Sequence, residues 1–283
     1  MEQARMSNDN ANINALVSPM ELLKDLRSVK MLDASYGLPA SNVRIGNAVD
    51  FDIDDVADPD AVYAHTLPSA ELFAEKVAAM GISNKDRVVV YDRMGMAMAA
   101  ARVWWMFRVF GHENVQVLDG GLSAWVRAGL PLESKTEDLP TPGAFTAAFR
   151  PELFKTGDAI LANISAPAFT VVDARDAKRY AGDVPEPRPG VESGHIPGSV
   201  NVPFNNLIDP TSGAFRQGAS LKEALAAVDA AKPVAVSCGS GVTACVIALG
   251  LYQLGHKDAA IYGGSWAEWG GNPALPRVKG SAP

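Results

Sequence analysis

The chain has 283 residues, of which 48% are hydrophobic and 20% charged, so it is long enough to form two globular domains. Its formal net charge of −7 argues against nucleic acid as a partner, because an acidic surface repels phosphate backbones. With only 2 cysteines, a disulfide framework and a paired-cysteine zinc site are both excluded, and a reducing, cytoplasmic setting is expected.

The ends and apolar runs of the chain give no sign of membrane targeting. Residues 1–14 are polar and lack the basic and apolar regions of a secretory signal, so we expect a short disordered lead-in there. The longest nearly apolar stretch, residues 244–251, is too short to span a bilayer. We therefore expect a soluble protein without a membrane partner.

The first half of the chain contains a short β-branched run at residues 87–92. A turn rich in Gly, Met and Ala follows it and leads into a helix predicted over 98–110, which ends at a Gly-His pair. A predicted strand at 115–118 and the motif Gly-Gly-x-x-x-Trp at 120–125 come next. This order of strand, loop, helix and strand predicts a βαβ unit.

The second half repeats this order. A β-run at 233–237 leads through a Gly-rich loop into a helix predicted over 242–254, again closed by Gly-His. A strand and a second Gly-Gly motif follow at 259–262 and 263–269. The repeat has no short period, so it indicates two duplicated domains rather than a solenoid. Two earlier pairs of segments also correspond, 29–34 with 170–174 and 44–48 with 195–199.

The alternation of strands and helices predicts an α/β fold with two domains in tandem, each a mainly parallel sheet flanked by helices. The domains are predicted over residues 17–140 and 156–283. Residues 131–155 contain four prolines and a glycine among charged residues, which is typical of a linker.

Cys238 directly follows a predicted strand, and a helix is expected to begin about four residues later. Ligands of open α/β sheets bind at this edge. Gly239 and Gly241 let backbone N–H groups turn toward one centre, and those donors favour negative charge there. The loop would therefore stabilise a thiolate or persulfide anion on Cys238, with a buried structural cysteine as the simpler alternative.

The loop Cys238-Gly-Ser-Gly-Val-Thr-Ala and the duplicated halves resemble the two-domain rhodanese-type sulfurtransferases over residues 17–269. The loop is similar to the branch that uses 3-mercaptopyruvate, since thiosulfate-preferring members carry Cys-Arg-Lys-Gly-Val-Thr. Thiosulfate is a compact dianion that two loop cations would assist, whereas 3-mercaptopyruvate carries its carboxylate away from the sulfur.

The resemblance implies that sulfur passes from 3-mercaptopyruvate through a Cys238 persulfide to a thiol acceptor such as thioredoxin, or to cyanide, and that pyruvate is released. It implies neither a metal nor an organic cofactor. The loop residues expected to contact the substrate are Gly239, Gly241, Val242 and Thr243.

The same resemblance places the carboxylate-binding arginines at Arg179 and Arg188, joined through Pro-Glu-Pro. A guanidinium group can bind a carboxylate with two parallel hydrogen bonds. Without the resemblance, both would be interpreted as solvated or salt-bridged surface residues. Arg175, which also follows a predicted strand, is expected to be structural.

A proton relay is implied by the resemblance, with Asp54, His65 and Ser240 as its members. In such a relay the Asp orients the His, and the His polarises the Ser hydroxyl. Relatives often have Asp-His where this chain has Ala64-His65, and Asp54 lies among other aspartates, so its register is easily misjudged.

Three other interpretations remain open. A thiosulfate:cyanide sulfurtransferase would differ in its preferred donor. A cysteine-based phosphatase requires an Arg where this chain has Ala244, so phosphate charge would be unmet. A non-enzymatic scaffold would commonly lack the cysteine. We expect His195 and Cys245 to be packing residues.

Overall fold

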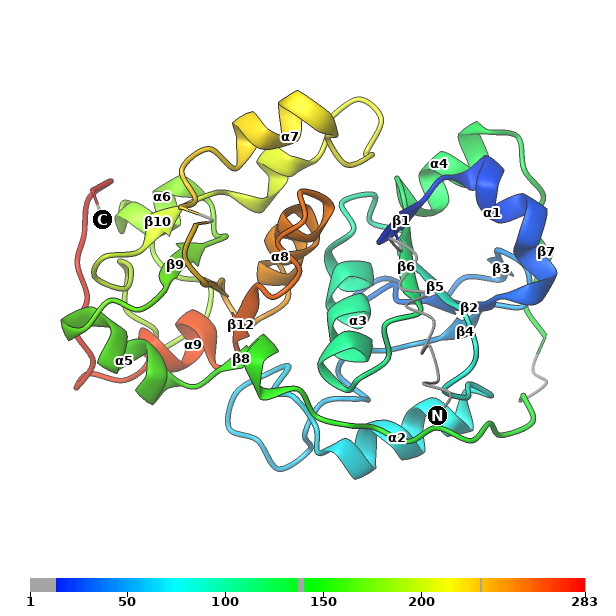
Figure 1. The fold of residues 1–283 in the computed structure, drawn as a ribbon, viewed down its shortest axis with the longest axis horizontal. Coiled ribbons are helices and arrows are strands. Elements are labelled where there is room, and N and C mark those ends of the chain that lie inside the picture. The colour runs from blue at the N-terminus through cyan, green and yellow to red at the C-terminus, as the bar shows by residue number, and fades with distance from the viewer. Residues whose placement is uncertain (1–13, 137–139, 230, 283) are drawn as a thin grey trace, which may run out of the picture.

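The computed structural model describes residues 14–136, 140–229 and 231–282. They form two lobes, and each lobe is built on a five-stranded sheet whose neighbouring strands are all parallel. Figure 1 shows the two sheets on either side of a central pair of helices. The predicted α/β fold with two tandem, mainly parallel sheets is confirmed.

The two sheets have the same strand order, as a duplication requires. The first runs β1 (Leu16–Val17), β6 (Val115–Leu118), β5 (Val88–Tyr91), β2 (Lys30–Asp33) and β4 (Val49–Asp50). The second runs β8 (Phe154–Lys155), β12 (Ala260–Tyr262), β11 (Val234–Ser237), β9 (Thr170–Asp173) and β10 (Val200–Asn201).

Helices cover both faces of each sheet, since parallel strands are joined by crossovers. In the first half, side chains of α2 (Ala70–Ala79) and α3 (Met98–Val109) lie in one apolar cluster, and those of α1 (Pro19–Asp25) and α4 (Gly121–Arg127) lie in another. In the second half, α7 (Gly218–Ala224) and α8 (Ala244–Gln253) are separated in the same way from α5 (Gly157–Ser165) and α9 (Ser265–Trp269). The remaining helix is α6 (Ala177–Ala181), and short 3₁₀ turns lie at Leu26–Ser28, Pro151–Leu153 and Phe204–Leu207.

Helices α3 and α8 pack against each other and join the two halves (Figure 1). Both helices are buried on nearly all sides, and their side chains belong to one continuous apolar cluster. Helices with apolar residues on nearly every side are typical of a buried position. The packing therefore unites the carboxyl edges of the two sheets around one interface.

The helix bounds differ slightly from prediction. Helix α8 begins at Ala244 rather than 242, because the Cys245 and Val246 N–H groups bond to carbonyls only three residues earlier, at Val242 and Thr243. Such tight bonds are typical of the first turn of a helix. The Cys238 loop is therefore slightly longer than the sequence indicated.

The segment predicted to be a linker makes specific contacts with the first half of the chain. Strand β7 (Glu133–Ser134) pairs antiparallel with β3 (Val43–Arg44). Gly143 then donates to the Ala78 carbonyl at the end of α2, and Phe145 is buried in the core. Much of this segment therefore packs on the first half before the chain enters the second sheet at β8.

Candidate functional site

Cys238 directly follows the carboxyl end of β11, the middle strand of the second sheet. Its side chain is buried, with the residue only 1% exposed. The Gly241 N–H donates to the Cys238 Sγ at 3.1 Å, and Gly241 has the positive φ of 80° that glycine adopts without strain. Of the loop N–H groups predicted to turn toward the sulfur, that of Gly241 forms a hydrogen bond with it.

Helix α9 holds the Cys238 loop from behind. The Cys238 N–H donates to the Ser265 hydroxyl at 3.2 Å. The Cys238 carbonyl accepts from the Trp266 N–H, and the Gly239 carbonyl accepts from the Ala267 N–H, both at 2.9 Å. The second Gly-Gly-Ser-Trp motif therefore supports the loop. Its contribution is to fix the backbone on both sides of the sulfur.

Asp92 occupies the equivalent place in the first half, directly after β5. Its Oδ1 accepts from the Gly95 N–H at 3.2 Å, as the Cys238 sulfur accepts from Gly241. Burial raises the pKa of Asp92. The first half thus keeps the loop geometry but carries a carboxyl group where the second half carries a thiol.

Arg179 and Arg188 lie together over the Cys238 loop. A Cβ on Gly239 would be 3.4 Å from the Arg179 Nη2 and 3.6 Å from the Arg188 Nη1. Both arginines come from α6 and the turn that follows it, and glycine at 239 leaves them room. The structure therefore brings both predicted arginines beside the cysteine loop.

The two arginines differ in how their charge is balanced. Arg179 donates to Glu186 through Nε at 3.1 Å and Nη2 at 2.6 Å, whereas Arg188 forms no ion pair with any residue that the structure describes. Burial opposes the charge of Arg179, but the Glu186 carboxylate outweighs it and raises the Arg179 pKa. Arg188 is thus the guanidinium more available to an incoming anion.

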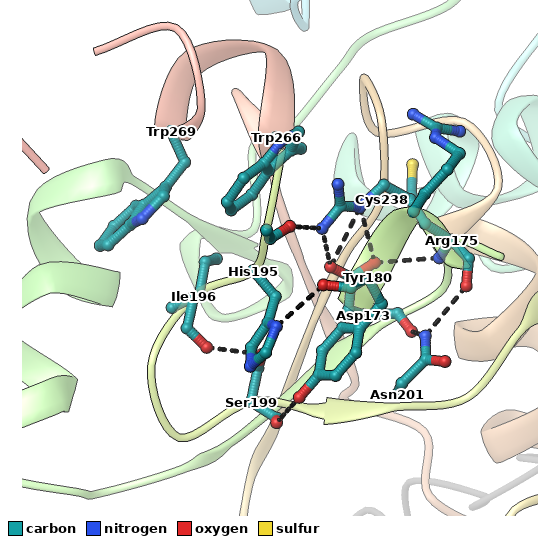
Figure 2. Close-up of polar contacts among 12 residues, drawn as sticks. Asp173, Arg175, Tyr180, His195, Ile196, Ser199, Asn201, Cys238, Trp266 and Trp269 are labelled. Atoms are coloured by element: carbon teal, nitrogen blue, oxygen red, sulfur yellow. Dashed lines mark hydrogen bonds and ion pairs between the residues drawn. The ribbon is translucent and has the colours of Figure 1, made fainter. Parts of the chain in front are cut away.

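Arg175 is structural, as expected. It binds Asp173, Glu186 and the Gly194 carbonyl, and its guanidinium lies over the Trp266 ring at 4.3 Å. Figure 2 shows Arg175 with Asp173 and Trp266 near Cys238.

His195 also serves the packing of the second half. It stacks on Tyr180 with ring centroids 3.7 Å apart, and its Nδ1 lies 2.9 Å from the Tyr180 carbonyl (Figure 2). Its Nε2 lies 3.0 Å from the Ala282 carbonyl. It is fully buried, on the far side of the Asp173–Arg175 pair from the cysteine loop. The expectation that His195 is a packing residue fits these contacts.

His65 comes from the first half and reaches the cysteine loop. Its Nδ1 lies 2.9 Å from the Ser240 Oγ, and its Nε2 lies 3.2 Å from the Asp54 Oδ1 without the alignment of a good hydrogen bond. The Ser240 hydroxyl also accepts from Arg188 Nη2 at 3.1 Å. All three predicted relay members therefore meet, with Asp54 at the exposed rim.

Burial lowers the pKa of His65, and the cations Arg102 and Arg188 act in the same direction, while Asp54 opposes them. His65 is therefore held uncharged near neutral pH. An uncharged imidazole can accept the Ser240 proton or return one to it.

The two last loop residues expected at the site are placed less directly. Val242 is half-buried and packs against the apolar core, and Thr243 precedes the first turn of α8. Cys245 is fully buried, its Sγ donates to the Gly241 carbonyl at 3.3 Å, and burial raises its pKa to about 12. Cys245 is thus a protonated packing residue, as predicted.

Three residues near the site were not identified from the sequence. Tyr36 lies edge-on to His65 with ring centroids 5.3 Å apart, Glu186 neutralises two arginines, and buried Arg102 approaches from α3. Arg102 had a detectable signal, an isolated charge within an apolar helix. Tyr36 and Glu186 had none, because their roles depend on distant parts of the chain.

Among residues 14–136, 140–229 and 231–282, no cluster of three or more His, Cys, Asp or Glu side chains could hold a metal ion. In the same described ranges, none of the helices has the length and apolar character needed to cross a bilayer.

Comparison with known proteins identifies relatives of the whole two-domain chain. The family model of the Rhodanese-like domain matches residues 19–128 and 156–272. Human 3-mercaptopyruvate sulfurtransferase is 41% identical over 90% of this chain and 91% of its own length. Rat thiosulfate sulfurtransferase is 40% identical over the same shares of the two chains. The crystal structure of SseA from Escherichia coli, described as a 3-mercaptopyruvate sulfotransferase, superposes with a TM-score of 0.79 at 34% identity, covering 89% of this chain and 99% of SseA.

Proposed function

The chain belongs to the rhodanese family of sulfurtransferases, and on that premise we propose that it moves sulfane sulfur from 3-mercaptopyruvate through a Cys238 persulfide to a thiol or cyanide. The observation that carries this proposal is the position of the Cys238 sulfur. It accepts an N–H from Gly241 and lies in the loop on which Arg179 and Arg188 converge.

In the first step the Cys238 thiolate attacks the sulfur of 3-mercaptopyruvate. A sulfur–sulfur bond forms, the carbon–sulfur bond breaks, and its electron pair leaves as the enolate of pyruvate. The enolate takes up one proton to give pyruvate, and Cys238 is left as a persulfide. The Gly241 N–H, already directed at the sulfur, stabilises negative charge there.

The charges around the loop favour a donor with a single carboxylate. Arg175 and Arg179 share the carboxylates of Asp173 and Glu186, so the positive charge of Arg188 is left unbalanced within the described chain. The carboxylate of 3-mercaptopyruvate would neutralise that charge through a bidentate contact. The thiosulfate dianion would exceed it by one negative charge.

Ser240 and His65 are suited to deliver the proton to the enolate. The Ser240 hydroxyl lies between Arg188 and His65, so it adjoins both the carboxylate-binding group and an uncharged base. The Asp54 carboxylate lies 3.2 Å from the other ring nitrogen, where its negative charge favours the tautomer that leaves Nδ1 free to accept from Ser240. Uncharged His65 first accepts, through Ser240, the proton that the donor sulfur carried, and the same pair then returns this proton to the enolate carbon, which leaves the Cys238 persulfide as an anion.

In the second step a thiol, such as that of thioredoxin, or cyanide attacks the outer sulfur of the persulfide. Cys238 leaves as a thiolate, and the acceptor carries the sulfur away. Two half-reactions through one covalent intermediate predict ping-pong kinetics. Because Cys238 must remain reduced between turnovers, we place the protein in the cytoplasm.

The decisive test compares 3-mercaptopyruvate and thiosulfate as donors at equal enzyme concentration. We expect a higher kcat/KM for 3-mercaptopyruvate, and a higher value for thiosulfate would establish the alternative, a thiosulfate:cyanide sulfurtransferase. The similarity to a thiosulfate sulfurtransferase makes this comparison necessary.

Mass spectrometry after donor treatment tests the covalent step. One added sulfur, about 32 Da, is expected on Cys238. The Cys238→Ser variant should show neither the adduct nor pyruvate release, while Cys245→Ser, which removes the only other thiol, should keep the adduct. Substantial pyruvate release by Cys238→Ser would contradict the assignment.

A further inference from the structure

Arg102 is a buried cation that the proposed reaction does not yet use. It lies on α3, is 2% exposed, and forms no ion pair with a carboxylate in the described chain. Its guanidinium rests over the Trp105 ring at 4.7 Å, and its Nε has no hydrogen-bond partner among these residues. Burial of a guanidinium without a carboxylate partner costs free energy, which only its hydrogen bonds and ring contact can offset.

The hydrogen bonds of Arg102 join the two halves at the active site. Nη2 donates to the His65 carbonyl at 2.7 Å, and Nη1 donates to the Gly241 carbonyl at 3.2 Å. The first acceptor belongs to His65, whose imidazole contacts the Ser240 hydroxyl. The second belongs to Gly241, the residue that follows Ser240 in the chain. A single rigid fork therefore holds the backbones on both sides of the His65–Ser240 contact.

The backbone of His65 needs such support. Its φ of 61° lies in the left-handed region, which a residue with a side chain adopts only at a cost. Gly241, the second acceptor, also has a positive φ and directs its N–H at the Cys238 sulfur. Arg102 thus hydrogen-bonds to the backbone of both residues whose positive φ the site requires, His65 and Gly241.

We propose that Arg102 is a positioning residue for sulfur transfer, whose guanidinium sets the His65–Ser240 hydrogen bond by binding the backbone carbonyls of His65 and Gly241. This inference rests on the proposed function, since it assigns Arg102 to the pyruvate-releasing step of the same site. Arg102 touches neither donor nor acceptor, and it acts through the two loops.

The charge of Arg102 has a second effect at the same place. It is one of the cations that lower the pKa of His65, together with Arg188, after the larger effect of burial. The other groups that face His65 are Asp54, the Ser240 hydroxyl and the edge of Tyr36. Removing the Arg102 charge should therefore raise the pKa of His65.

Arg108 provides a matched control on the same helix. It is also buried and donates across the interface, to the Lys257 carbonyl at 3.0 Å, but it is paired with Glu113 and lies away from His65 and Ser240. The Arg108→Met variant removes a buried guanidinium between the halves without touching the site. It reports what the loss of interface packing alone does.

The experiment compares Arg102→Met, Arg102→Lys and Arg108→Met with the unmodified protein, after circular dichroism has checked folding. For Arg102→Met we expect kcat for pyruvate release to fall by about 100-fold, the cost typical of a misplaced catalytic group. KM for 3-mercaptopyruvate should change little, and the acid limb of the pH profile should move to higher pH. Arg102→Lys should keep the acid limb in place, because it keeps the charge, but should still lose kcat, because an ammonium cannot reproduce the two-pronged contact.

Proton NMR titration of His65 gives a readout that needs no turnover, and the chain has only 4 histidines to resolve. A raised titration in Arg102→Met, but not in Arg102→Lys or Arg108→Met, supports the proposal. An equal loss of kcat in Arg108→Met, or an unshifted titration in Arg102→Met, overturns it. If Arg102→Met does not fold, the lysine variant decides, since an unchanged kcat there also overturns the proposal. Absence of pyruvate release by the unmodified protein would instead overturn the proposed function, and the NMR titration would still test Arg102.

Discussion

The Ser265 hydroxyl accepts the backbone N–H of Cys238 at 3.2 Å, and Ser265 does so from a left-handed conformation with φ of 50°. The first half has Gly121 at this place, with φ of 56°. Serine costs more than glycine in this conformation, so the hydroxyl contact explains why the second half carries a side chain here. The contact couples α9 to the loop that bears the reactive sulfur.

We expect Ser265→Gly to lower kcat by about 10-fold, because the Cys238 N–H loses a partner of about 1 kcal/mol, while relief of the left-handed strain limits the loss of stability. Ser265→Ala should keep the strain and lose the contact, so its free energy of unfolding should fall by about 2 kcal/mol. Steady-state kinetics and urea unfolding measure the two effects. Gly121→Ser is the reverse control, where a Cβ would meet the Asp92 carbonyl at 2.5 Å and should destabilise the fold. Equal kcat in Ser265→Gly and the unmodified protein would contradict the role of the hydroxyl.

The pH dependence should reflect His65, whose pKa is lowered from 6.5 mainly by burial. The acid limb of kcat should therefore lie below pH 6.5, where His65 begins to gain a proton. Asp54→Asn removes the largest of the effects that raise the pKa of His65, so the limb should move to still lower pH, while kcat falls because the ring loses the charge beside its Nε2. A shift to higher pH in Asp54→Asn would contradict this assignment.

The same group affects stability with a definite sign. Because the folded pKa of His65 is below the unfolded value of 6.5, the unfolded chain binds a proton first as the pH falls. The contribution of His65 to stability should be complete above pH 6.5 and decline as the pH falls toward the folded pKa. Denaturant unfolding of His65→Gln and of the unmodified protein across this pH range measures this contribution. The free energy of unfolding should fall more steeply with decreasing pH in the unmodified protein than in His65→Gln.

Arg188→Gln should raise KM for 3-mercaptopyruvate by about 100-fold, since it removes a guanidinium that no carboxylate of the described chain neutralises. Arg179→Gln should raise KM by about 10-fold, because Glu186 already holds two of its nitrogens. Arg216→Gln, which removes an exposed hydrogen bond to the carbonyl of Asn206, serves as the control. Equal effects of Arg179→Gln and Arg188→Gln would show that both guanidinium groups bind the donor alike.

Glu186 should be important for stability as well as for arginine geometry. Its side chain is 3% exposed and is held between Arg175 and Arg179. Glu186→Gln leaves buried Arg175 with less compensation and should lower the free energy of unfolding by about 3 kcal/mol. Chemical unfolding measures this, and Glu152→Gln, which affects an exposed ion pair with Arg150, should cost less than about 1 kcal/mol.

Local sequence determined much of the fold and the centre of the site. A β-branched run followed by a Gly-rich loop and an apolar helix specifies a strand, a turn and a crossover through short-range effects, so the duplication and the place of Cys238 after β11 were predictable. The sequence also predicted that Asp92 of the first half takes the position that Cys238 has in the second half. The relative positions of residues a few places apart in the chain are fixed mainly by the local backbone conformation.

Tertiary structure alone decided what surrounds the sulfur. His65 and Ser240 are 175 residues apart in the chain, and they meet only because α3 packs against α8 and brings the two sheet edges together. Resemblance to a family suggested their partnership, but no spacing in the sequence could derive it. The unbalanced charge of Arg188, the pairing of Arg179 with Glu186 and the fork of Arg102 depend in the same way on distant segments that close around one interface. Sequence sets the backbone conformation near each residue, whereas charge balance and burial are properties of the assembled core.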